Sequence, residues 1–312
     1  MPNWSEILGE LKKEGSTHDI LRRKYLESLS ALTGRNTILY YSGWLQKGQL
    51  GLMDHGTFGI SDSDKTGFMT CIHKLDRSKG LDLVLHTPGG STAATESLVD
   101  YLRAMFGTNI RAIVQEIAMS AGTMICCAST EIIMGKHSSL GPIDPQIGNL
   151  PAHGIIEEFN RASSEVQQNP ATAYIWQPIL AKYNPALIGE CQKAIAWSEE
   201  MTKEWLVSGM FLGDPNAAAK ATKIIIEFGD HALTKSHSRH MGIDRARNAG
   251  LKVTALEDDD KLQDAVLSVH HICIQTLMDT PTFKIIENQE KVAFLQQVHI
   301  QTSGPFPVLR TS

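Results

Sequence analysis

The 312-residue sequence lacks any apolar run approaching the roughly 20 residues that a membrane-spanning helix needs. Its N-terminus lacks the basic region and apolar stretch of a secretory signal peptide. The five cysteines form no CxxC pair, which is typical of free buried thiols in a reducing compartment. Basic residues are in deficit, and the formal net charge of -5 disfavours nucleic acid as the main partner. We therefore expect a cytoplasmic protein without a membrane span, a signal peptide or a nucleic-acid partner.

Internal repeats, low-complexity segments and linkers rich in proline, glycine or serine are also missing. Hydrophobic residues make up 42% of the chain, which is enough to bury a full core. The composition therefore predicts a folded globular protein and gives no sign of disorder.

Strand and helix patterns alternate over the first half of the chain. Apolar, β-branched runs predict strands at 37–42, 81–85, 110–114 and 131–134. Stretches with helical spacing predict helices at 62–79, 91–105 and 123–128. This order is typical of a mostly parallel sheet with helices on its faces.

The remaining segments are mainly helical. The expected helices are 5–32, interrupted near 15–16, and 155–169, 178–210, 216–227 and 262–278, with a last strand at 252–254 and an irregular end. The segment 148–229 carries more apolar side chains than one small sheet can cover, which favours a homo-oligomer. These residues are Ile155, Ile156, Phe159, Trp176, Ile179, Leu180, Trp197, Trp205 and Phe211.

Two short turns carry the residues best suited to chemistry. The sequence His-Thr-Pro-Gly-Gly at 86–90 closes one predicted strand, and Met-Ser-Ala-Gly-Thr at 119–123 follows the next. Ligands collect at such strand ends in α/β sheets. The glycine amides suit an oxyanion hole and Ser120 suits a nucleophile. Each motif alone is also a common turn or helix cap, so their order along the chain carries the prediction.

Together these motifs resemble the Clp-protease/crotonase superfamily, and Leu-Gly-Pro-Ile-Asp-Pro-Gln at 140–146 resembles its serine dehydrogenase proteinase family, which is related to signal peptide peptidase A. The resemblance implies an α/β, Clp/crotonase-like fold of repeated ββα units. It also implies a helical oligomerisation arm and a C-terminal helical extension. The corresponding divisions are an N-terminal helical segment at 1–35, a peptidase domain at 36–255 with the arm at 148–229, and a helix and tail at 256–312.

The resemblance further implies a catalytic triad of Ser120, Asp144 and His237. In this arrangement Ser120 attacks the acyl carbon, His237 transfers its proton and Asp144 orients the imidazole. The backbone amides of Gly90 and Ala121 would form the oxyanion hole. The implied activity is that of a serine endopeptidase acting on polypeptide substrates.

Several alternatives stay open. His240 competes with His237 because His-Ser-Arg-His at 237–240 departs from the family pattern, and Lys136 could supply a Ser–Lys dyad. Asp144 lies between two prolines and could simply fix a turn. His86 is more typical of a structural strand-end histidine.

No cofactor or metal is expected, because the histidines 231, 237 and 240 lack a cysteine or acidic partner at metal-ligand spacing. A crotonase-type acyl-CoA enzyme, which would need a CoA pocket, and an inactive scaffold of the same fold are the alternative functions. The sequence leaves the requirement for an ATPase partner undetermined.

Overall fold

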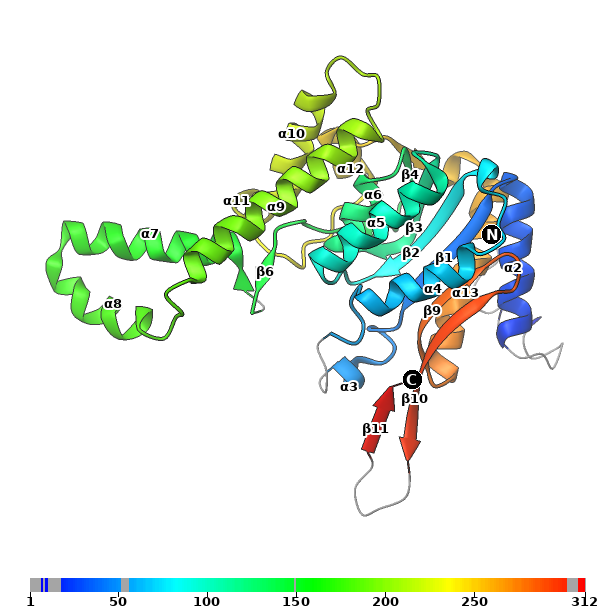
Figure 1. Cartoon of the computed structure of the whole chain (residues 1–312), viewed down its shortest axis with the longest axis horizontal. Coiled ribbons are helices and arrows are strands. Elements are labelled where there is room, and N and C mark those ends of the chain that lie inside the picture. The colour runs from blue at the N-terminus through cyan, green and yellow to red at the C-terminus, as the bar shows by residue number, and fades with distance from the viewer. Residues whose placement is uncertain are drawn as a thin grey trace.

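The computed structural model describes residues 7, 9–10, 18–51, 56–148, 150–301 and 308–311. These residues build one large mixed sheet with helices on both faces and a helical arm at one end (Figure 1). Along the sheet the strands follow the order β11-β10-β9-β1-β2-β3-β4-β8, and β5 pairs with the end of β3. The predicted α/β architecture is therefore confirmed.

The strands of the large sheet are β1 (Asn36–Ser42), β2 (Leu81–Thr87), β3 (Ile110–Ala118), β4 (Glu131–Met134), β5 (Ser139–Leu140), β8 (Val253–Ala255), β9 (Thr282–Asn288), β10 (Ala293–Gln301) and β11 (Val308–Thr311). The helices around the sheet are α2 (His18–Thr33), α3 (Gly48–Gly51), α4 (Asp62–Ile72), α5 (Thr92–Phe106), α6 (Ala121–Cys127), α12 (Ile243–Ala249) and α13 (Asp260–Asp279). Beyond them lie α7 (Ala152–Gln168), α8 (Ala173–Leu180), α9 (Leu187–Ser208), α10 (Ala217–Gly229), α11 (His231–Thr234) and the short pair β6 (Gln146–Ile147) and β7 (Leu150–Pro151).

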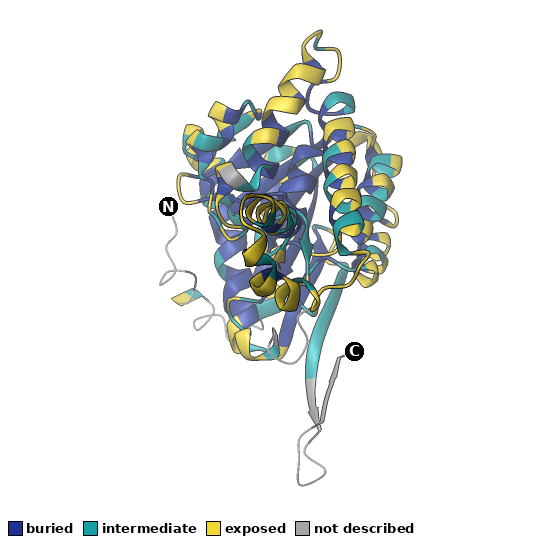
Figure 2. Ribbon diagram, turned by 90° about the vertical axis from the view of Figure 1, so that its left-hand side faces the viewer, coloured by how far each residue is buried: buried dark blue, intermediate teal, exposed yellow. Residues whose placement is uncertain are grey.

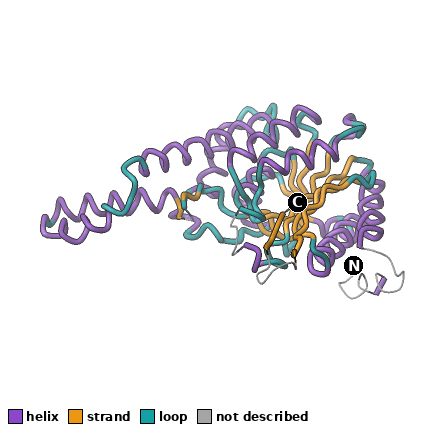
Figure 3. Tube along the Cα trace, turned by 60° about the horizontal axis from the view of Figure 1, so that its bottom comes forward, coloured by secondary structure: helices purple, strands orange, loops and turns teal. Residues whose placement is uncertain are grey.

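The centre of the sheet is parallel, because β1, β2, β3, β4 and β8 all run in the same direction. Every residue of β1 and β2 is buried, so these strands form nearly continuous apolar runs. One hydrophobic cluster joins one face of the sheet to α4, α5 and α6, and a second joins the other face to α2 and α13. Figure 3 shows the sheet between its two helical layers.

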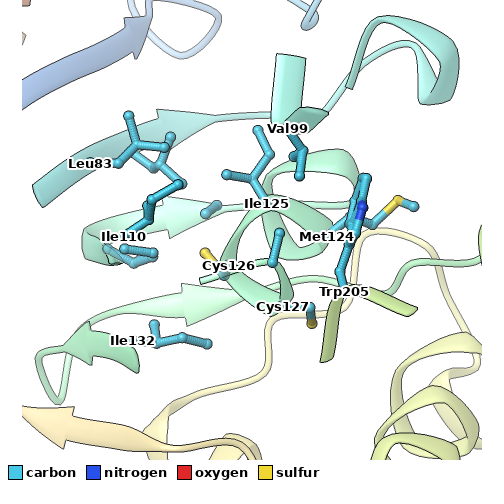
Figure 4. Close-up of a cluster of buried hydrophobic side chains, with 14 of the residues drawn as sticks. Leu83, Val99, Ile110, Met124, Ile125, Cys126, Cys127, Ile132 and Trp205 are labelled. Atoms are coloured by element: carbon cyan, nitrogen blue, oxygen red, sulfur yellow. The ribbon is translucent and has the colours of Figure 1, made fainter. Parts of the chain in front are cut away.

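Helix α6 lies in the middle of the first cluster. Its residues Met124, Ile125, Cys126 and Cys127 are buried against neighbouring strands and helices (Figure 4). A helix that is apolar on all sides belongs in a core. The residue that precedes α6 is therefore held at a rigid end of the sheet.

The sequence prediction of the last strand was wrong. Strand β8 is present, but it is not the last strand of the chain. Strand β9 follows α13 and pairs antiparallel with β1, at the opposite end of the parallel strands from β8. Lys284 and Glu287 lie inside β9 and are buried, with Lys284 Nζ 3.0 Å from Asp64 Oδ1 and Glu287 paired with Arg22. The segment 256–312 therefore contributes strands to the sheet as well as a helix.

The arm consists of α7, α8 and part of α9, which project away from the sheet (Figure 1). The predicted helix 178–210 is two helices, because the chain turns between α8 and α9. Part of the apolar surface expected there is absent, since Ile155, Trp176, Trp205 and Phe211 are buried within the chain itself. Tyr174 and Ile175, which the sequence analysis did not select, are 84% and 63% exposed instead. Figure 2 shows the contrast between the buried sheet and the largely exposed arm.

The predicted N-terminal helix is described from His18 onward as α2, and the expected interruption near Gly15 lies outside the described residues. Across the described residues, the structure contains no helix whose length and apolarity would let it cross a membrane.

Candidate active site

Ser120 lies at the sharp turn between β3 and α6. Its backbone has φ 51° and ψ -116°, a conformation that residues with a side chain rarely adopt. Such a turn lifts a nucleophilic side chain to the end of a strand. Ser120 occupies the N-cap position of α6, but its side chain makes no capping hydrogen bond. The capping role that the sequence also allowed is therefore not performed.

The two glycines of the first turn lie directly beside Ser120 and a second backbone segment. A Cβ added at Gly89 would lie 2.7 Å from the Cβ of Ser120. A Cβ added at Gly90 would lie 2.1 Å from the backbone nitrogen of Ile60. Both glycines have positive φ, 102° and 155°. Only residues without a side chain allow this close approach.

Ile60 holds the glycine turn in place. Its N–H donates to the Gly89 carbonyl at 2.7 Å, and its carbonyl accepts from Ser91 N–H at 2.9 Å. These two bonds involve the carbonyl before Gly90 and the N–H after it. The N–H of Gly90 itself has no acceptor among the described residues. The N–H of Ala121, at the first turn of α6, also lacks one within the same residues. One unpaired amide therefore directly follows Ser120, and the other directly follows Gly89, the glycine that lies against Ser120. Backbone amides of this kind can serve as oxyanion-hole donors.

Thr123 fastens the loop that carries Asp144 to helix α6. Its Oγ1 lies 2.8 Å from the Ala118 carbonyl oxygen and 2.9 Å from the Gly141 carbonyl oxygen, and it accepts the Gly141 N–H at 2.9 Å. Ser198 on α9 donates to the carbonyl of Ile143 at 3.1 Å. The loop is thus fixed to the same helix that presents Ser120.

The same loop is joined to the histidine region from its other side. Leu140 and Met241 exchange two backbone hydrogen bonds of 2.9 Å each. The side chain of Asp144 is fully buried, and its Oδ1 lies 2.8 Å from Nδ1 of His237. Its Oδ2 accepts from Gln146 Nε2 at 3.1 Å. This geometry is that of an orienting carboxylate and an imidazole whose other nitrogen, Nε2, remains available.

The other candidate bases occupy different surroundings. His240 is exposed, and Asp144 pairs with His237 instead. Lys136 is exposed on a turn, where its backbone N–H donates to Glu257 Oε1 at 2.9 Å. His231, considered before only as part of a histidine cluster, has its Nδ1 3.7 Å from Asp144 Oδ2.

The described residues include no hydrogen bond between Ser120 and His237. The structure therefore brings Asp144 and His237 into direct contact and connects the loop of Asp144 to the helix of Ser120 through Thr123. Catalytic hydrogen bonds are often long in a free enzyme and tighten when substrate binds.

Sequence reasoning did not identify Ile60 and Thr123 as site residues. Thr123 is the last residue of the Met-Ser-Ala-Gly-Thr motif, so its place in that motif was a usable signal. Ile60 gave none, because it lies 29 positions before Gly89 and belongs to no motif that the sequence analysis identified. Its contribution depends on backbone hydrogen bonds that only the fold creates.

Comparison with known protein families shows which family the chain belongs to. The model of the family described as "ClpP-like SDH-type serine proteinase" matches residues 19–259. The chain belongs to this family. This match confirms the resemblance that the motifs at 86–90, 119–123 and 140–146 indicated. The matched residues make up most of the chain.

Two curated proteins of the archaeon Methanocaldococcus jannaschii are similar to this family member. The uncharacterized protein MJ1495 is 31% identical over 209 residues, which are 66% of this chain and 65% of that protein. The uncharacterized protein MJ0137 is 26% identical over 246 residues, 76% of this chain and 77% of that protein. The match thus spans less than two thirds of the first relative.

A solved structure described as a 1510-N membrane-bound stomatin-specific protease S97A mutant shares 18% sequence identity. The match covers 66% of this chain and 79% of that one, with a TM-score of 0.37. These values are too low for the likeness to bear on function.

Proposed function

We propose that this chain is a serine endopeptidase in which Ser120, Asp144 and His237 form the catalytic triad. The observation that carries the proposal is the 2.8 Å contact between Asp144 and His237, on loops anchored to the helix that Ser120 precedes. Membership in a serine proteinase family supports the same chemistry.

The proposed reaction follows the acyl-transfer scheme of a serine triad. The Nε2 atom of His237 accepts the Ser120 hydroxyl proton as the oxygen attacks the peptide carbonyl. The imidazolium that results is stabilised by the buried carboxylate of Asp144, and it then protonates the leaving amine. Water hydrolyses the acyl-enzyme by the same steps, with His237 again acting as the base.

The two unpaired amides next to Ser120 would stabilise the negative oxygen of the tetrahedral intermediate. The N–H of Gly90 comes from the glycine turn and that of Ala121 from the start of α6. Loss of one oxyanion-hole donor typically lowers kcat by about 10²–10³. The short helix α6 also directs the positive end of its dipole toward the same place.

We further propose polypeptide substrates and assembly of the chain into a homo-oligomer through its arm. Tyr174 and Ile175 on α8 expose large apolar surfaces that would become buried between subunits. Light scattering at micromolar concentration should therefore give a multiple of the 34.3 kDa chain mass. A monomer mass would contradict the proposed assembly.

The catalytic proposal is tested by the hydrolysis of an unfolded protein and of a small peptide ester. The Ser120→Ala variant should be inactive on both. Asp144→Asn should lose about 10⁴-fold in kcat, because the amide favours the wrong imidazole tautomer. Far-UV circular dichroism should show that both variants remain folded.

His237 and His240 provide a matched pair of histidine variants. His237→Ala should be as inactive as Asp144→Asn, since triad members act as a unit. His240→Ala should retain most activity, because His240 is exposed and lies outside the Asp144 contact. An inactive His240→Ala with an active His237→Ala would reassign the base. Full activity in both variants would exclude His237 and His240 as the base.

A further inference from the structure

The second face of the sheet contains a cluster of two histidines and a glutamate that the proposed reaction does not use. His86 comes from β2, Glu116 from β3 and His270 from α13. Side chains alternate along β2, so His86 and its neighbour Thr87 point to opposite faces of the sheet. Thr87 faces α6, because a Cβ added at Gly122 on that helix would lie 2.5 Å from the methyl carbon of Thr87. The cluster therefore lies on the side of the sheet opposite to Ser120.

The distances within this cluster are those of metal ligands rather than of a hydrogen-bonded network. Nδ1 of His86 and Nε2 of His270 each lie 3.5 Å from the same oxygen, Oε2 of Glu116. A tetrahedral ion bound at about 2.0–2.1 Å places its ligand atoms about 3.4 Å apart. All three ligand atoms lie within 4.8 Å of one another, so a small side-chain movement completes the geometry.

His86 carries buried nitrogens that nothing else satisfies. Its side chain is fully buried, and neither ring nitrogen has a hydrogen-bond partner among the described residues. Buried polar groups without partners are rare in native proteins, and each one calls for a bound ion, a water molecule or a functional reason. The ring centroids of Tyr41 and Trp44 lie 5.3 Å and 4.5 Å from the His86 ring centroid, so aromatic rings pack against this histidine.

A second contact orients His270. Its Nδ1 lies 3.3 Å from the hydroxyl of Tyr41, which can accept the Nδ1 proton. That tautomer leaves the Nε2 lone pair directed at Glu116. Metal-binding histidines typically hold their other ring nitrogen in this way.

An irregularity between β2 and β3 directs Glu116 into the cluster. Leu85 pairs with Val114 and Thr87 with Ala118, so β3 advances four residues while β2 advances two. Bulges of this kind re-aim side chains and occur beside functional sites. Here the bulge turns Glu116 toward the α13 side of the sheet, where it meets both histidines.

We propose that His86, Glu116 and His270 bind one divalent transition-metal ion of the zinc class. Two imidazoles and a carboxylate suit such ions, and the open fourth position would hold water. Glu116 is 36% exposed, which gives the ion a path from solvent. The ion would tie α13 to β2 and β3 beneath the strand ends that lead to the glycine turn and to Ser120.

Burial disfavours the charged form of all three side chains, because it lowers the pKa of both histidines and raises the pKa of Glu116. Burial lowers the pKa of His86 to about 3 and lowers the pKa of His270 well below 6.5. Both imidazoles are therefore neutral near pH 7, as metal ligands must be. The sequence analysis expected no metal anywhere in this chain, and the proposed site departs from that expectation.

The test measures metal binding by the full-length protein directly. Protein treated with a chelator should bind Zn²⁺ with a stoichiometry of one by calorimetry, and the metal should raise the melting temperature. Bound Co²⁺ should give the intense visible bands of four-coordinate cobalt. Binding by Glu116→Gln and His270→Ala should be at least about 100-fold weaker, since even partners of metal ligands contribute 10–100-fold.

Two control variants separate this site from the catalytic proposal. His271→Ala removes the neighbouring histidine of α13 and should bind Zn²⁺ normally. His237→Ala should bind Zn²⁺ normally while losing peptidase activity. Glu116→Gln is nearly isosteric at a partly exposed position, so it should remain folded even if a histidine variant does not. The proposal is overturned if wild-type protein binds no Zn²⁺, or if Glu116→Gln binds it as tightly as wild type.

Discussion

Replacing Ser120 by glycine should remove activity and raise stability, whereas replacing it by alanine should remove activity with little change in stability. The backbone of Ser120 lies at φ 51° and ψ -116°, outside even the small left-handed region that L-residues tolerate. Residues held in such regions cost about 1–3 kcal/mol each. The Ser120 side chain makes no capping bond, so its hydroxyl contributes nothing that alanine would lose.

The expected gain for glycine follows from two opposing effects. Glycine removes the strain of about 1–3 kcal/mol but adds about 0.4–1 kcal/mol of unfolded-chain entropy. The net stabilisation of Ser120→Gly over Ser120→Ala should be about 0.5–2 kcal/mol. Urea unfolding followed by circular dichroism resolves such a difference as a shift in the midpoint at constant slope.

Lys74 supplies the matched control. It has φ 68° on an exposed turn far from the site, so Lys74→Gly should also be more stable than Lys74→Ala. Both Lys74 variants should keep wild-type activity. The strain argument fails if Ser120→Gly is no more stable than Ser120→Ala while the Lys74 pair behaves as expected.

Three further predictions concern the framework of the site. Thr123→Val leaves the buried Gly141 N–H unpaired, so the free energy of unfolding in urea should fall by about 1–3 kcal/mol and kcat at least tenfold. An unchanged kcat would show that Thr123 does not position the Asp144 loop. Lys284→Met leaves the Asp64 carboxylate buried without its cation, so the free energy of unfolding should fall by about 3–5 kcal/mol. The second change Asp64→Leu should restore most of this stability, and additive losses in the double variant would contradict the pairing. Cys191 is buried by the small arm cluster alone, so it should be the first thiol to react with Ellman's reagent, and Cys191→Ser should remove that fast phase.

The parallel strands were predictable because their burial on both faces requires continuous apolar sequence. Leu81–Thr87 and Glu131–Met134 show this pattern in the printed sequence and form strands where expected. Strand β9 was missed because Lys284 and Glu287 interrupt its apolar residues. Their partners, Asp64 and Arg22, are more than 200 positions away, so local sequence cannot show that the charges are buried in pairs.

The same limit applies to the site. The motifs identified the turns of Ser120 and Asp144 because turn chemistry is local. The choice between His237 and His240 depends on which one faces Asp144, and that follows from the bridge between Leu140 and Met241.

The cluster on the far face of the sheet shows a further limit of strand periodicity. Regular alternation from Ile113, which lies on the α13 face, assigns Gln115 rather than Glu116 to that face. The register shift between β2 and β3 reverses this assignment and cannot be seen in the sequence.

Covalent labelling with a fluorophosphonate is the most direct test of the central claim, that Ser120 is a nucleophile activated by His237. The reagent forms a stable adduct only with an activated serine, and peptide mass spectrometry locates the adduct. Wild-type protein should carry one adduct, on Ser120. Labelling should be absent in Ser120→Ala, strongly slowed in His237→Ala and unchanged in His240→Ala. A wild-type protein that is not labelled, or is labelled on another serine, would contradict the account.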